Sequence, residues 1–176
     1  MAKWNAFPFA GDYAFDADSV RKHWARLHAS DLEPLPKDTT LLGAWAHFHN
    51  GEFQLACEAG LKLGGAGITL ANKATCIYAT YLEHKEKEKL DLFLAVAARA
   101  HTQATTDPLN PNAWHWQAYA LGRYSQGISV AKALAQGLGS KVKDALEKAI
   151  ALNPKHSDAH VALGTFHAEV IDKVGP

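Results

Sequence analysis

Apolar residues recur every three or four positions along most of the chain after residue 17, which is the spacing of an α-helix with one buried face. The clearest example covers residues 141–152, where Ser140 is a residue type that begins helices and Pro154 is one that ends them. No segment combines alternating apolar and polar residues with the turn signals of a β-hairpin. The pattern therefore predicts an all-α protein.

Glycine and proline residues divide this pattern into eight or nine helices with short connections. Because short connections favour antiparallel neighbours, we expect the helices to pack as hairpins within one helical-repeat domain, residues 17–176. The expected helices cover residues 19–29, 41–50, 52–63, 71–83, 86–106, 113–124 and 141–152, and a last helix begins near Ser157 and stops before Gly175.

The first sixteen residues differ from the rest of the chain, because they combine five aromatic side chains with glycine, proline and aspartate in a segment too irregular for a helix. The aromatic residues are Trp4, Phe7, Phe9, Tyr13 and Phe15. An exposed cluster of this density would be a contact site or an aggregation hazard. We expect residues 1–16 to form an aromatic arm that lies over the first helices. The alternative is an arm that docks on another subunit and forms a homo-oligomer.

Charge and composition narrow the classes of function. The chain has 18 basic and 18 acidic residues, so it lacks the basic excess of nucleic-acid-binding proteins and we expect no nucleic-acid partner. No apolar run approaches the roughly 18 residues that span a bilayer, and the N-terminus lacks the apolar stretch of a secretion signal. We therefore expect a cytoplasmic protein with no membrane partner. Cys57 and Cys76 lie among apolar helical residues and should be buried free thiols.

Two stretches resemble the tetratricopeptide repeat. Gly51, Phe53 and Ala56 fit its Gly-x-aromatic-x-x-Ala turn and second helix, and the run from Ala149 to Gly164 has a small residue five positions before Pro154 and Leu-Gly nine and ten positions after it. The resemblance implies a right-handed superhelix of antiparallel helical hairpins. Its units would be residues 41–65, 68–106 and 112–152, followed by a C-terminal capping helix at 155–172.

The segments 114–127 and 141–163 also resemble the C-terminal repeats of the regulator of microtubule dynamics family. That family contains tetratricopeptide-like domains with a long insertion between paired helices, and residues 128–139 would be the insertion here. The combined resemblance covers residues 41–65 and 107–172. No residue pattern extends it to microtubules.

Histidine spacing raises the question of a metal site. His156 and His160 are four residues apart, a spacing that places two imidazoles on one helical face. His167 shares that face but lies seven residues beyond His160, a rise of about 10 Å, so one zinc ion cannot easily reach both. If Ser157 caps the helix, His156 lies outside it. We therefore expect no metal and no cofactor.

Motifs for catalysis are missing from the sequence. Gly122 to Ser129 has the glycine spacing of a phosphate-binding loop, but Ile128 occupies the lysine position and the segment follows a helix instead of a strand. No serine lies in a nucleophile-elbow pattern. We predict that the protein is not an enzyme and has no catalytic residues.

The expected function is a scaffold that binds a protein or peptide. Aromatic and cationic residues next to the insertion are the types that anchor interfaces, and histidines on the last helix could face the same groove. The predicted partner-binding residues are Trp114, Tyr119, Arg123, Tyr124, His160 and His167. The alternative is a small-ligand or metal-binding protein with a polar pocket near residues 122–139.

Overall fold

A computed structural model describes residues 3–174, and in this range the chain is all-α, as expected. It forms nine helices and no β-strand within the described residues. The helices are α1 (Ala17–Leu27), α2 (Thr39–His49), α3 (Phe53–Leu63), α4 (Gly67–Tyr81), α5 (Glu86–Thr106), α6 (Pro111–Gln126), α7 (Val130–Ala135), α8 (Leu138–Leu152) and α9 (Ser157–Val174).

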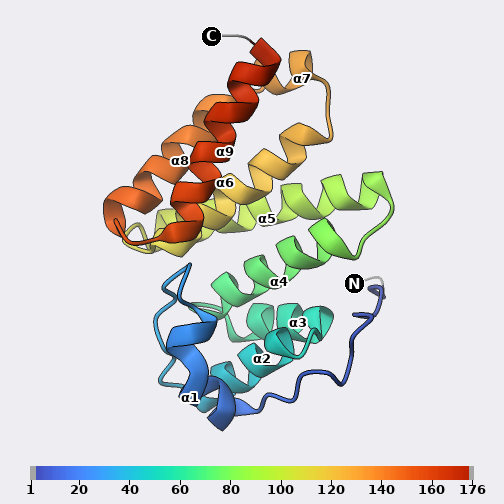
Figure 1. Cartoon of the computed structure of the whole chain (residues 1–176), viewed down its shortest axis with the longest axis vertical. Helices are drawn as coiled ribbons and strands as arrows, with labels where there is room; N and C mark the ends of the chain where they lie inside the picture. Colours follow the sequence, from blue (N-terminus) through green and yellow to red (C-terminus); the bar gives the residue numbers. More distant parts are fainter. Residues whose placement is uncertain (1–2, 175–176) are drawn as a thin grey trace.

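The long helices pack mainly against their neighbours in the chain, so the fold grows along its length from α1 to α9. Figure 1 shows α1, α2 and α3 at one end of the molecule, α4 and α5 in the middle, and α6, α8 and α9 at the other end. The short helix α7 packs against α8. Helices α6 and α8, which α7 separates in the chain, pack directly against each other.

Two hydrophobic clusters form the core, and α4 contributes to both. The first cluster surrounds Trp45 and receives Leu70, Ala71 and Ala74 from the first half of α4. The second surrounds Trp116 and receives Cys76 and Ala79 from the second half. Because one rigid helix supplies both clusters, the two ends of the molecule are held together by α4. Cys57 and Cys76 are buried free thiols, which confirms the expectation for both cysteines.

Two helix starts differ from the expected ones. Helix α8 begins at Leu138, because Gly137 takes the left-handed conformation (φ 61°) and starts the helix there. Ser140 lies inside the helix, so the prediction that it is the N-cap was wrong.

Helix α4 begins at Gly67, four residues earlier than expected. A Cβ at Gly60 would lie 2.4 Å from the Gly67 carbonyl oxygen, so the close approach of α3 and α4 requires glycine at position 60.

The expected insertion, residues 128–139, contains the short helix α7. The Ser129 side chain caps this helix by accepting a hydrogen bond from the Lys132 backbone N–H at 3.3 Å. Leu134 on α7 is exposed, whereas Leu138, the first residue of α8, is buried. The insertion is therefore an ordered turn of helix that leads into α8.

The N-terminal arm contacts α3, α4 and the residue that follows α2. Trp4 stacks on Tyr78 of α4 with ring centroids 4.1 Å apart, and Phe7 packs edge-on against Phe53 of α3. The Phe15 backbone and the Asn50 side chain exchange two hydrogen bonds. Two aromatic residues of the arm remain largely exposed, Phe9 at 58% and Tyr13 at 52%.

Candidate functional site

The connection between α1 and α2 reaches across the molecule to α9 (Figure 1). Ser30 in this connection accepts a backbone hydrogen bond from Asp158 at 3.2 Å and donates its hydroxyl to the Asp158 carboxylate at 3.1 Å. Leu32 has a positive φ of 48°, a conformation uncommon for a residue other than glycine. We call residues 28–36 the crossing loop. It brings charged side chains into the interior between the two ends of the fold.

The first buried polar group on this loop is Asp31. Its carboxylate accepts a hydrogen bond from His28 Nδ1 at 3.0 Å and forms an ion pair with Lys73 of α4. Burial by itself would raise the pKa of Asp31, but the hydrogen bond from His28 and the charge of Lys73 outweigh it and hold the pKa well below its usual range. Burial lowers the pKa of His28. Asp31 is therefore charged opposite Lys73, and His28 donates to it as a neutral imidazole.

The second buried polar group is Glu33, which contacts α6. Asn112 donates its side-chain N–H to Glu33 Oε2 at 2.6 Å and to the Asp31 carbonyl at 3.1 Å. Its own side-chain oxygen accepts a hydrogen bond from His156 Nε2 at 2.8 Å. Burial, and then the nearby Asp31 charge, raise the pKa of Glu33 to about 8. Glu33 is therefore a neutral acid at pH 7, joined through Asn112 to the residue that precedes α9.

Sequence reasoning did not identify the crossing loop. His28 lies within the helix expected over residues 19–29, and no local pattern marks Asp31 or Glu33 as a buried acid. The available signal was the length of that connection, because the eleven residues between α1 and α2 exceed what a short antiparallel helix pair requires.

A groove of about 570 Å³ lies between α4, α6, α8 and α9, and Ser30 of the crossing loop is among its lining residues. Two of the predicted partner-binding residues, Tyr119 and Arg123, line it. The Arg123 guanidinium lies over the Tyr119 ring at 5.4 Å from the centroid, and its Nη1 donates to Gln126 at 3.2 Å. Such stacking holds a cation in place while leaving part of its donor set free.

Buried polar atoms without a partner also belong to residues of this groove. Within the described part of the chain, His115 Nδ1 and Trp116 Nε1 make no hydrogen bond, although both atoms are buried. Burial, and then the nearby His156, lower the pKa of His115 to about 3, so its ring is neutral. An unsatisfied buried polar group typically costs 1–3 kcal/mol, and a bound ligand that supplied its partner would recover that energy.

The other four predicted residues lie outside the groove lining. Tyr124 is buried in the core, and the half-buried Trp114 donates its indole N–H to the Pro108 carbonyl at 3.1 Å. His160 is exposed and lies 3.0 Å from the Pro154 carbonyl, while His167 is exposed beside Phe166. Helical periodicity alone does not determine which side chains of a helix face the groove.

The histidines considered for a metal site are separated by their contacts. His156 is buried and bound to Asn112, whereas His160 is exposed on the first turn of α9. Among the residues that the structure describes, no group of three His, Cys, Asp or Glu side chains is positioned to hold a metal ion. None of the described helices is both long enough and apolar enough to cross a membrane.

Comparison with known proteins gives a family for this chain. The family model described as Regulator of microtubule dynamics protein 1-3 matches residues 53–173, from the first residue of α3 to within α9. Searches of curated proteins and of solved structures gave no significant match. The match covers well over half of the sequence and includes every residue that lines the groove except Ser30, but it excludes the arm, α1, α2 and the crossing loop. The chain therefore belongs to the regulator of microtubule dynamics protein 1-3 family.

Proposed function

We propose that this chain is a tetratricopeptide-like scaffold that binds a protein or peptide segment in the groove between α4, α6, α8 and α9, without catalytic activity. The observation that carries the proposal is the composition of the groove. It combines exposed apolar side chains, a stacked arginine and two buried polar atoms without a partner. These are the features of a surface that is completed by a ligand.

The tetratricopeptide assignment is supported by the positions of its motif residues. Gly51 adopts φ 79° between α2 and α3, and Ala56 is fully buried on the next turn. Ala149 of α8 and Ala159 of α9 are fully buried, and Pro154 lies in the turn between them. Small residues at these positions allow close helix packing, as the repeat requires.

A polypeptide partner is favoured by the exposed walls of the groove. Tyr81 of α4 is 66% exposed and Val161 of α9 is 69% exposed, so apolar surface extends along both sides. The charged lining residues have both signs, with Lys73 and Arg123 facing the same space as Asp158 and Glu169. A protein segment with mixed apolar and charged side chains matches this lining.

The alternative, a small-ligand protein, is supported by the size of the groove, since about 570 Å³ lies within the usual range of small-molecule sites. Catalysis is disfavoured by the locations of the two acid–histidine side-chain pairs that have hydrogen-bond geometry in the described residues. His47 and Glu52 lie on the surface outside the groove lining. Asp31 and His28 are almost fully buried, and no substrate could reach them without opening of the loop. The two free cysteines support a reducing, cytoplasmic location as part of this proposal.

Photo-crosslinking tests the proposal. A photoreactive phenylalanine analogue at position 81, on the groove wall, should capture a discrete protein from the host cell. The same analogue at Leu55, an exposed residue of α3 outside the groove, is the matched control. The expected result is a product specific to position 81 that is lost in an Arg123→Ala background. Identical products at both positions would contradict the proposed site, and a small molecule that blocks all crosslinking at position 81 would favour the alternative.

A further inference from the structure

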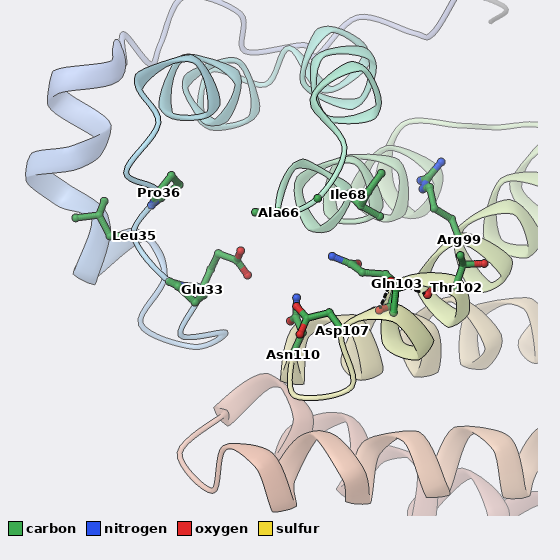
Figure 2. A pocket seen from close by; sticks show the side chains of 13 residues that line it. Glu33, Leu35, Pro36, Ala66, Ile68, Arg99, Thr102, Gln103, Asp107 and Asn110 are labelled. Carbon is green, nitrogen blue, oxygen red and sulfur yellow. Dashed lines mark hydrogen bonds between the residues drawn. The ribbon is translucent and has the colours of Figure 1, made fainter.

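A second cavity, of about 590 Å³, is lined in part by residues 33–36 of the crossing loop. The crossing loop, the turn before α4, and α5 with the start of α6 form its walls (Figure 2). Figure 2 shows Glu33 on the loop side, with Arg99 and Gln103 on the α5 side. This cavity shares no lining residue with the groove, so what it binds is independent of the proposed scaffold function.

Arg99 is the cation of this cavity. Its Nε donates to Asn72 Oδ1 at 2.6 Å, and its Nη2 donates to the Ala71 carbonyl at 3.3 Å and to Thr75 Oγ1 at 3.2 Å. All these acceptors are neutral, and no carboxylate within the described residues forms an ion pair with Arg99. The guanidinium is therefore fixed against α4 with its charge uncompensated, and its Nη1 makes no hydrogen bond in the described part of the chain.

Two further donors lie in the same cavity. Glu33 is only 8% exposed and uses one carboxyl oxygen to accept the Asn112 hydrogen bond. Since burial raises its pKa to about 8, the other oxygen carries a proton at neutral pH and can donate it. Asn110 caps α6 with its side-chain oxygen, and its amide N–H₂ has no partner in the described residues. Arg99, Glu33 and Asn110 thus offer donors to one space.

Part of the remaining wall of the cavity is apolar. Pro34, Leu35 and Pro36 of the crossing loop face it from one side, and Ala66 and Ile68 contribute from the turn before α4 and from its first residues. The one carboxylate that lines the cavity besides Glu33 belongs to Asp107, which lies at the exposed rim. Donors in the interior and apolar groups around them suit a ligand with one acceptor-rich head and a short apolar body.

We propose that this cavity binds a small organic carboxylate, with the carboxylate held by Arg99, Glu33 and Asn110 and an apolar body packed against Pro34, Pro36 and Ile68. The carboxylate supplies the negative counter-charge that Arg99 lacks, and it accepts a hydrogen bond from Nη1 of the Arg99 guanidinium. The volume fits a molecule of the size of an aryl-acetic acid.

Phenylacetate is the probe, and phenylacetamide, which has the same shape without the charge, is the ligand control. Isoleucine methyl signals in NMR spectra of the full chain report the location, because Ile68 lines this cavity and Ile77 on the same helix lines the groove. We expect phenylacetate to shift the Ile68 signal in a saturable manner and to leave the Ile77 signal in place. Phenylacetamide should bind at least about tenfold more weakly, because it lacks the charge-assisted hydrogen bonds.

Two arginine variants complete the test. Arg99→Met should weaken phenylacetate binding by at least about tenfold, whereas Arg123→Met, which removes an arginine from the other site, should leave it unchanged. If Arg99→Met does not fold, as judged by circular dichroism, the comparison of phenylacetate with phenylacetamide on the wild-type protein still tests whether the cavity prefers a carboxylate. Equal binding of the two ligands, a response at Ile77 alone, or no saturable shift at millimolar phenylacetate would overturn the proposal.

Discussion

Asn112 donates a hydrogen bond of 2.6 Å to the carboxyl group of Glu33, a residue that lies 79 positions away in the chain. The same amide accepts from His156 at 2.8 Å, so one fully buried side chain joins the crossing loop, α6 and the start of α9. This link fixes the position of the loop, whose Ser30 lines the groove and whose Glu33 lines the second cavity. The N-terminal and C-terminal parts of the fold therefore depend on each other through polar contacts as well as through the apolar core.

Removal of this link should destabilise the protein. Asn112→Ala leaves Glu33, His156 and the Asp31 carbonyl without their shared partner in a buried site, so we expect a loss on the order of 2–4 kcal/mol in the free energy of unfolding. Urea denaturation measures it. Asn153→Ala is the matched control, since the Asn153 side chain makes only a local bond to Lys155 and should cost much less. Equal losses would show that Asn112 has no special role.

Glu33 should make stability fall as the pH rises from 7 to 8. The unfolded chain loses this proton near pH 4.5, whereas the folded protein keeps it until about pH 8, so the folded state binds the extra proton between these values. The buried histidines act in the opposite direction, but the pKa of 6.5 in the unfolded chain places most of their effect below pH 7. We expect a decrease of roughly 1 kcal/mol over this interval, absent in Glu33→Gln. A slope that persists in the variant would assign the effect to another group.

The buried histidines should make stability fall as the pH decreases below 6.5. Burial lowers the pKa values of His49 and His115 to about 3, below the 6.5 of the unfolded chain. Only the unfolded state takes up their protons as the pH falls below 6.5, so stability is lost in this range. His115→Gln should reduce the loss between pH 7 and 5 by on the order of 1–2 kcal/mol, and His160→Gln, at an exposed position, should not. The readout is the difference between denaturation curves at the two pH values.

The aromatic arm should contribute to stability through Trp4 more than through Phe9. Trp4 is half-buried and stacks on Tyr78, and its backbone N–H donates to the Gln54 side chain at 2.9 Å, whereas Phe9 is mostly exposed. Trp4→Ala should lower Tm by several degrees, which corresponds to roughly 1–2 kcal/mol, while Phe9→Ala leaves it nearly unchanged. If Phe9→Ala instead alters the oligomeric mass, the arm docks on another subunit.

The sequence predicts the helices well, because each is encoded locally. Helix α5 covers residues 86–106, as its apolar spacing and the flanking residues indicate, and Gly51 and Pro154 mark turns. The early start of α8 was missed, since Gly137 is one of several glycines near that point and only its left-handed backbone distinguishes it.

The candidate site was harder to predict, because it depends on contacts distant in sequence. Helical spacing cannot decide which of Tyr119, Arg123 and Tyr124 faces a groove until the neighbouring helices are placed. Tyr119 and Arg123 line the groove, and Tyr124 belongs to the core. The burial of Glu33 depends on Asn112 and His156, and no local pattern joins these residues.

The most direct test of the scaffold proposal is the affinity of the segment captured at position 81, prepared as a synthetic peptide and measured by titration calorimetry. Arg123→Ala should weaken binding by on the order of 1–2 kcal/mol, a typical loss for an interface anchor, with Tm nearly unchanged. Arg26→Ala, at an exposed arginine of α1 that does not line the groove, is the control and should bind as the wild type does. Wild-type affinity in Arg123→Ala, or a collapse of its fold with binding retained in the folded fraction, would contradict the proposed groove.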